Sequence, residues 1–283
     1  MFNYSLKNEA LKIHKNALEI YNASNEKMNN TCEKLYSKRK KSVEVIKMVE
    51  NVINSVANTP KDYNTKMGKV HKELNLFKET IEYANKAYDD AVKAGVNIVG
   101  GVATGVGVAA FAPTALMSLA TTFGTASTGT AISALSGAAA QKAAVAWLGR
   151  TFAGAAVKQG AGMAVGKVFL SLAGPVGWGI SAISTGASLI SFSDKNRKLS
   201  DDIITEAKDI AKAKEELDET TERINELIIK TCKIYNDINK QRKKISSLAY
   251  VNYNILDCET KTFLGTLVNN TLSLSELINK NIE

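Results

Sequence analysis

Residues 203–245 read IITEAKDIAKAKEELDETTERINELIIKTCKIYNDINKQRKKI, and an apolar residue returns at every seventh position with one exception. These positions are Ile203, Ile210, Leu217, Ile224, Thr231, Ile238 and Ile245. Side chains spaced by seven lie on one face of an α-helix, so the pattern predicts a coiled-coil seam. We expect one helix over residues 195–250, about 80 Å long at ~1.5 Å per residue.

The N-terminal part of the chain also has helical periodicity. Residues 3–57 place apolar side chains at Leu6, Ile13 and Ile20, and further apolar positions follow in a shifted register. A shifting register means that the apolar stripe winds around the helix axis. The sequence therefore predicts one long N-terminal helix.

A break is expected at Thr59 and Pro60, because threonine can cap a helix and proline suits the first helical turn. The helix that follows has apolar residues in steps of three and four, which indicates another seam. Its positions are Met67, Val70, Leu74, Phe77, Ile81, Ala84, Tyr88 and Ala91. The same spacing continues through Gly95 and Ala109, so we expect this helix to run to Pro113.

The composition favours an all-α fold, because the chain has only 3 prolines and 7% aromatic residues. We expect an elongated antiparallel helical bundle, a coiled-coil stalk, with a central Gly/Ala-rich hydrophobic helical head. The arms are residues 1–93 and 194–283, and the head is residues 94–193. The arms should pair in antiparallel fashion because the head between them brings the chain back. A last helix over residues 255–280 should pack on the stalk.

The central block is set apart by its lack of acidic residues. All 28 acidic residues lie outside residues 94–193, which hold 17 of the 19 glycines. Residues 94–141 carry no charge and are long enough for two membrane crossings at roughly 20 residues each. Their high Ala, Gly, Ser and Thr content makes insertion marginal. This favours a segment that is packed away in water and inserts when a membrane is present.

Small residues recur at four-residue spacing in this block, which places them on shared helix faces. We expect the residues that mediate membrane insertion and helix association to be Gly101, Gly105, Ala109, Gly129, Ser133, Gly137, Gly162 and Gly166. Small side chains let helix backbones approach closely in lipid. The alternative is a tightly packed, soluble helical core.

Two resemblances follow from these patterns. The order of long helix, hydrophobic head and long helix resembles the α-helical pore-forming toxins of the haemolysin E type, which implies a shielded apolar head that is released for insertion. The run ALSGAAAQKAAVAWLGRTFAGAAVKQGAGMAVGKVFLSLAGPVG, residues 134–177, resembles glycine-zipper segments of uncharacterised bacterial proteins. It departs from that pattern at Arg150, Phe152, Lys158 and Lys167, which argues against simple membrane spanning in this half.

Nothing in the sequence supports catalysis. His14 and His71 are the only histidines, and neither has partners at metal-ligand spacing, so both are expected on the solvated surface. Cys32, Cys232 and Cys258 lack metal or redox spacing and are expected to be reduced, partly buried thiols. No P-loop is present. We therefore expect no catalytic residue, no cofactor and no metal.

The basic residues are compatible with either of two anionic partners, lipid or nucleic acid. The net charge is +8, and an excess of this kind favours approach to an anionic membrane at least as well as to nucleic acid. The KRKK run at Lys38–Lys41 can contact phosphate groups of either, although a solvated helix face is the simpler interpretation.

The function that the sequence favours is that of a pore-forming or membrane-permeabilising protein, a bacterial-type toxin or effector that forms homo-oligomers on a lipid bilayer. The alternative is a non-enzymatic coiled-coil scaffold or membrane tether whose arms bind a protein partner. The N-terminus lacks the unbroken apolar stretch of a Sec signal. We therefore expect a product made in the cytoplasm that leaves by another route or joins a membrane on activation.

Overall fold

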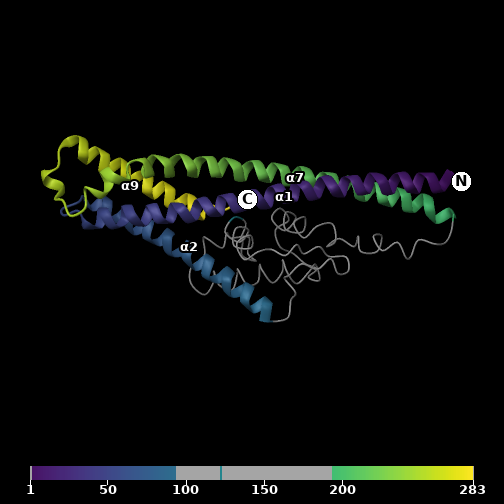
Figure 1. The fold of residues 1–283 in the computed structure, drawn as a ribbon, viewed down its shortest axis with the longest axis horizontal. Coiled ribbons are helices and arrows are strands. Elements are labelled where there is room, and N and C mark those ends of the chain that lie inside the picture. Colours follow the sequence, from purple (N-terminus) through teal and green to yellow (C-terminus); the bar gives the residue numbers. More distant parts are fainter. Residues whose placement is uncertain (1, 94–121, 123–192, 283) are drawn as a thin grey trace.

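The computed structural model describes residues 2–93, 122 and 193–282, and in these ranges the protein is all-α (Figure 1), as the sequence predicts. The helices are α1 (Phe2–Ser55), α2 (Lys61–Lys93), α7 (Ser193–Lys240), α8 (Arg242–Ser246) and α9 (Cys258–Asn279), with a 3-10 turn η3 (Tyr253–Ile255). The described ranges contain no strand beyond an isolated bridge between Ala57 and Asn252.

Each described arm is a helical hairpin. In the N-terminal arm α2 runs back along α1. Glu50 contacts His71 and the Tyr36 ring stacks on the Phe77 ring, so residue numbers fall along α1 as they rise along α2. In the C-terminal arm α9 runs back along α7, and it packs on α1 and α2 as well. The expectation that the last helix packs on the stalk is therefore confirmed.

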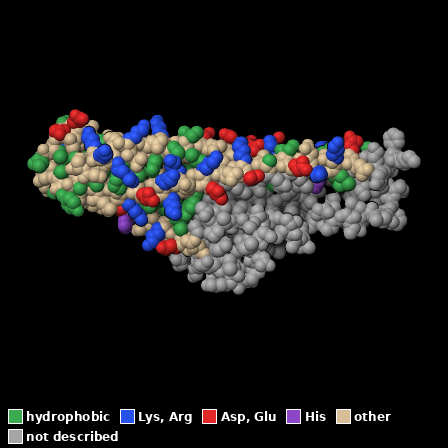
Figure 2. Space-filling model, in the orientation of Figure 1, with side chains coloured by type: hydrophobic (Ala, Val, Ile, Leu, Met, Phe, Trp, Pro, Cys, Tyr) green, Lys and Arg blue, Asp and Glu red, His purple; other side chains and the backbone are tan. Residues whose placement is uncertain are grey.

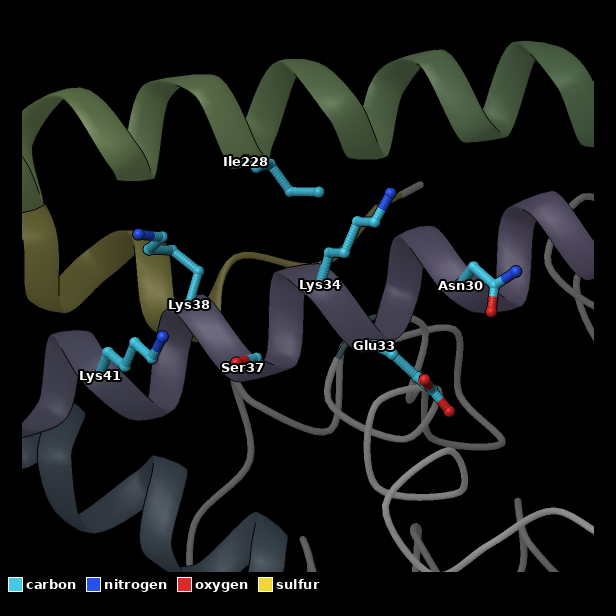
Figure 3. Close-up of a pocket in the computed structure, with 7 residues that line it drawn as sticks. All are labelled: Asn30, Glu33, Lys34, Ser37, Lys38, Lys41 and Ile228. Atoms are coloured by element: carbon cyan, nitrogen blue, oxygen red, sulfur yellow. The ribbon is translucent and has the colours of Figure 1, made fainter.

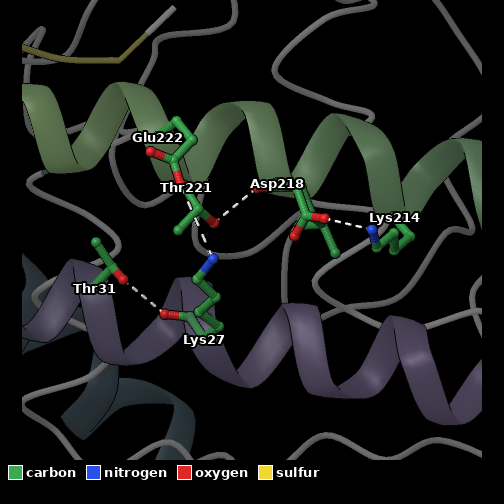
Figure 4. Close-up of polar contacts among 7 residues, drawn as sticks. Lys27, Thr31, Lys214, Asp218, Thr221 and Glu222 are labelled. Atoms are coloured by element: carbon green, nitrogen blue, oxygen red, sulfur yellow. Dashed lines mark hydrogen bonds and ion pairs between the residues drawn. The ribbon is translucent and has the colours of Figure 1, made fainter.

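The two longest helices, α1 and α7, lie side by side and run in the same direction (Figure 1). Lys27 of α1 pairs with Glu222 of α7 at 4.0 Å (Figure 4), and the Lys38 ammonium lies 4.4 Å from the centroid of the Tyr235 ring. Residue numbers rise together along both helices. The antiparallel pairing that we expected between the two arms was therefore wrong for α1 and α7, and the antiparallel neighbours are instead the helices within each hairpin. Each arm reverses at its own turn, so the head is not needed to bring the chain back.

Both turns lie at the same end of the stalk and are bonded to each other. The Ala57 amide donates to the Val251 carbonyl at 2.9 Å, and the Tyr253 amide donates to the Ala57 carbonyl at 2.9 Å. Asn58 and Tyr250 adopt left-handed backbone angles, with φ of 59° and 62°. An asparagine tolerates this conformation, whereas a tyrosine is strained in it. The surrounding structure therefore holds the backbone of Tyr250 in this turn.

The break predicted at Thr59 and Pro60 falls between α1 and α2. Pro60 directly precedes the first residue of α2, one position earlier than expected, and its carbonyl accepts a hydrogen bond from the Tyr63 amide at 2.9 Å. Asp62 lies in the first turn of α2, where a carboxylate stabilises the helix dipole. Because α1 already ends at Ser55, Pro60 marks the start of the second helix rather than the end of the first, and this start is encoded locally.

The core lies along the contact between α1 and α7. All seven heptad positions of the C-terminal arm are at most 5% exposed. They are Ile203, Ile210, Leu217, Ile224, Thr231, Ile238 and Ile245. The one polar member, Thr231, donates its hydroxyl to the Leu227 carbonyl at 2.7 Å, so its burial leaves no unmet donor.

The first turns of α1 depart from the expected seam. Leu6, Ile13 and Ile20 are about half exposed, at 46%, 47% and 47%. The buried positions of this segment are instead on a neighbouring face and include Ala10 and Tyr21. Among the described helices, α2 and α9 do not extend alongside this part of α1 (Figure 1). No third described helix therefore covers the apolar stripe formed by Leu6, Ile13 and Ile20.

The helix expected over residues 195–250 is interrupted once. α7 ends at Lys240 and α8 begins at Arg242, with Gln241 between them. The Gln241 amide donates to the Ile238 carbonyl at 3.0 Å, which is a tighter turn than an α-helix makes. Ile245 stays fully buried beyond the break, so the seam continues through it.

Charged side chains of both signs are spread over the outer face of the stalk. In Figure 2 lysine and arginine side chains are interspersed with aspartate and glutamate along the visible side. Several charges form pairs within one helix, such as Lys214 with Asp218 at 2.6 Å (Figure 4), and the Lys214 ammonium holds the pKa of the Asp218 carboxyl below its usual value. Exposed pairs of this kind add little stability, and they keep the stalk hydrated.

Candidate functional site

The small-residue faces proposed for helix association lie outside the described residues. This holds for Gly101, Gly105, Ala109, Gly129, Ser133, Gly137, Gly162 and Gly166, and for the expected continuation of α2 to Pro113. Within the central block, Thr122 is the one interior residue that the structure describes. The candidate site is therefore the place where Thr122 meets the stalk.

Thr122 is fully buried, and its backbone carbonyl accepts a hydrogen bond from the Ile282 amide at 3.0 Å. Ile282 lies just beyond the end of α9, in the C-terminal residues of the chain. A bond between backbone groups does not depend on the identity of either side chain. The contact joins the central block to the tail of the C-terminal arm.

The tail is held on α2 by Asn279, the last residue of α9. The Asn279 side-chain amide donates to the Glu73 carbonyl at 2.8 Å and to the Glu73 carboxylate at 2.6 Å. Asn279 is 8% exposed, so water does not compete strongly for these bonds. One amide group thus satisfies both the backbone and the side chain of Glu73.

The tail is held on α1 by Arg39, which is fully buried. Its guanidinium donates from Nη2 to the Lys280 carbonyl. Burial lowers the pKa of Arg39 to about 9, so the group is still charged at neutral pH. A buried cation requires compensating acceptors, and the Lys280 carbonyl is one of them. We call the bonds from residues 279–282 to Arg39, Glu73 and Thr122 the tail contact.

Cys32 lies beside Arg39 and is fully buried. Burial raises the pKa of the Cys32 thiol to about 12, against the opposing influence of Arg39 and a hydrogen bond with Thr122. The thiol is therefore neutral and unreactive at neutral pH. Cys232 is partly buried and Cys258 is exposed, and all three are free thiols.

The structure corrects two sequence-based expectations about polar residues. His14 is 7% exposed rather than solvated, whereas His71 is exposed and its Nδ1 lies 3.0 Å from a Glu50 carboxylate oxygen. The KRKK run is not a uniform solvated face, because Arg39 points into the core while Lys40 and Lys41 are exposed.

A signal for Arg39 exists in the sequence. Buried residues of α1 follow steps of four and three without a gap from Met28 to Ile53. They are Met28, Cys32, Leu35, Arg39, Ser42, Ile46, Val49 and Ile53. Arg39 therefore occupies a seam position, and the periodicity predicts burial even though the residue type does not. No comparable local pattern marks Thr122.

The described residues contain neither a metal-binding cluster nor a helix that could span a membrane. No group of three or more His, Cys, Asp or Glu side chains is arranged to hold a metal ion. No described helix combines the length and the hydropathy needed to cross a bilayer.

Comparison with known proteins assigns no family. No protein-family model matches the chain, and no curated protein or solved structure matches it. The described fold defines the protein as an all-α, two-hairpin stalk whose C-terminal tail contacts the central block.

Proposed function

We propose that the protein is membrane-active and permeabilises a lipid bilayer by inserting part of its central block. The observation that carries the proposal is the joining of an acid-free, glycine-rich block to a charged helical stalk at a buried contact, Thr122 with Ile282. Acidic residues are costly in hydrocarbon, and a block of 100 residues without one suits a lipid environment.

In this proposal the protein first folds as a helical bundle in water, with the tail contact holding the central block on the stalk. At a bilayer, residues 94–141 leave the stalk and insert. Helices then associate through small residues such as Gly101 and Gly105, since close backbone approach is a main source of attraction between helices in lipid. Several copies assemble in this way and open a path for solutes.

The experiment is release of a dye from liposomes with and without anionic lipid. We expect the full chain to release dye and a deletion of residues 94–141 to be inactive. Silence of the full chain across lipid compositions and pH values would refute the proposal. Circular dichroism of the deletion variant checks that its arms still fold.

A finer test replaces glycines by leucine inside the central block. Gly101→Leu with Gly105→Leu should abolish assembly and release, because the added side chains separate the helix backbones. Gly68→Leu is the matched control, since a Cβ added at Gly68 meets no atom within 4 Å. Loss of release in both variants would show that added bulk acts in a nonspecific way.

One observation favours the alternative, a scaffold or tether that binds a protein partner. Leu6, Ile13 and Ile20 form an exposed apolar stripe at heptad spacing on α1, which is the surface that a partner helix recognises. Ile13→Glu with Ile20→Glu should then abolish partner binding without affecting the fold. The glycine variants above separate the two functions, because a tether keeps its partner when Gly101 and Gly105 are replaced.

A further inference from the structure

A groove between α1 and α7 gathers lysine side chains. Asn30, Glu33, Lys34, Ser37, Lys38 and Lys41 of α1 line it together with Ile228 of α7, and its volume is about 600 Å³ (Figure 3). The lysines are spaced by four and three residues, which places them on one helix face. In Figure 3 Lys34 and Lys38 extend from α1 toward α7 on either side of Ile228.

These lysines lack the acidic partners that other lysines of the stalk have. Lys15, Lys78 and Lys214 each pair with a carboxylate four residues further along the helix. In contrast, the residue four positions after Lys34 is Lys38, and Lys38 and Lys41 are followed at that distance by Ser42 and Val45. Among the described residues, no carboxylate lies within 4.0 Å of any of the three ammonium groups.

Like charges at this spacing destabilise a helix, and a bound anion would remove the repulsion. Glu33 is the one acidic residue of the lining, so the three lysines leave the groove with a positive charge. The side chains that line the groove are exposed or half-buried, which allows a ligand to enter without a change of fold.

Part of the groove is already ordered for a ligand. The Lys38 ammonium lies 4.4 Å from the centroid of the Tyr235 ring, and this cation–π contact restricts the side chain. The Ser37 hydroxyl and the Asn30 amide add uncharged hydrogen-bond donors to the lining. Lysine ammonium groups with such donors match a phosphate group, and the Ile228 side chain offers an apolar wall beside it.

We propose that this groove binds the phosphate of an anionic phospholipid headgroup. The inference rests on the proposed function, because that function brings the stalk to a membrane surface. Inorganic phosphate shares the same chemistry, so the experiment separates the two sources. The groove would then attach the stalk to the bilayer while residues 94–141 insert.

The test compares two variants that lose the same charge. Lys34→Gln with Lys38→Gln and Lys41→Gln removes the groove lysines, whereas Lys208→Gln with Lys212→Gln and Lys233→Gln removes exposed lysines of α7. Binding is measured by flotation of the full chain with vesicles of phosphatidylcholine alone or mixed with phosphatidylglycerol. We expect the groove variant to bind the mixed vesicles at least about tenfold more weakly than wild type and the control to change about twofold or less.

Three results would overturn the inference. Equal loss of vesicle binding in both variants would mean that the overall positive charge of the protein, and not the groove, attracts it to the vesicles. Saturable binding of inorganic phosphate, with vesicle binding unaffected in the groove variant, would mean a site for free phosphate. Tighter binding to a DNA duplex than to mixed vesicles would mean a nucleic-acid site.

A second groove variant and a separate measurement of dye release distinguish failure of the headgroup site from failure of the proposed function. Lys34→Gln with Lys41→Gln keeps the Lys38–Tyr235 contact and should still weaken vesicle binding, so loss of that contact cannot explain the weaker binding. Dye release is recorded separately from flotation. If the wild type releases dye but the variants do not differ in flotation, the headgroup site is refuted and the proposed function stands. If flotation depends on the groove lysines but no protein releases dye, the proposed function is refuted and the headgroup site stands.

Discussion

Replacement of Asn279 by alanine should loosen the tail contact and show what it contributes. The Asn279 amide makes one bond to the Glu73 carbonyl at 2.8 Å and one to the Glu73 carboxylate at 2.6 Å. A neutral bond contributes about 0.5–1.5 kcal/mol and a bond to a charged group about 1.5–3 kcal/mol. The free energy of unfolding should therefore fall by about 2–4.5 kcal/mol.

Urea denaturation at neutral pH measures this loss, and Asn269→Ala is the matched control because Asn269 is an exposed asparagine on the same helix. A double-mutant cycle with Glu73→Ala isolates the pair, and its coupling energy should be about 1.5–3 kcal/mol. A coupling energy near zero, or a loss no larger than that of Asn269→Ala, would refute the assignment of these bonds.

The same variant tests the link to the central block. A loosened tail weakens the bond from the Ile282 amide to the Thr122 carbonyl, so Asn279→Ala should release dye from liposomes faster than wild type. Slower release in a folded Asn279→Ala protein would show that the tail contact promotes insertion rather than restrains it.

Three more predictions concern the core and the thiols. Ile224→Ala should lower the free energy of unfolding by about 2–5 kcal/mol, whereas Ile229→Ala, at a side chain that is 67% exposed, should change it by less than about 0.5 kcal/mol in the same urea titration. Alkylation followed by mass spectrometry should modify Cys258 first, Cys232 more slowly and Cys32 only on unfolding. The pKa of Cys32 is raised from 9.0 to about 12 in the folded state, so the stability that it contributes is complete below pH 9.0 and is lost as the pH rises toward 12. Arg39, with its pKa lowered to about 9, opposes this trend, so comparison with Cys32→Ala isolates the contribution of the thiol. Above pH 9 the free energy of unfolding of the wild type should fall by about 1.4 kcal/mol per pH unit more than that of the variant. Parallel pH profiles of the two proteins would contradict the burial of the thiol.

The long helices were predictable because each carries a strong local signal. The heptads of residues 203–245 place every seam residue in the core, and Thr59 with Pro60 marks the first reversal of the chain. Periodicity identifies which face of a helix is buried. It does not identify the direction of the helix that packs against that face, which is why the parallel pairing of α1 with α7 was not predicted.

The tail contact was beyond sequence reasoning for a related reason. Arg39 and Lys280 are 241 positions apart, and Asn279 and Glu73 are 206 apart, so nothing local connects them. In the first turns of α1 the sequence pattern predicted burial of the stripe that contains Leu6 and Ile13, and both side chains are about half exposed. The buried stripe contains smaller or more polar residues, such as Ala10 and His14, which carry a weaker hydrophobic signal.

The parallel alignment of the two hairpins makes the described stalk taper. Both turns lie at one end, where four helices pack together, whereas α1 and α7 alone among the described helices reach toward the N-terminal end (Figure 1). An amide near Ile53 is enclosed by several helices, whereas one near Ile13 has a single described neighbour. Protection against hydrogen–deuterium exchange should therefore decline steadily from the turns toward residue 2, because local opening requires less free energy where fewer contacts must separate. The stalk should open from its two-helix end, so an external force or partner acting there would separate α1 from α7 before the turns come apart.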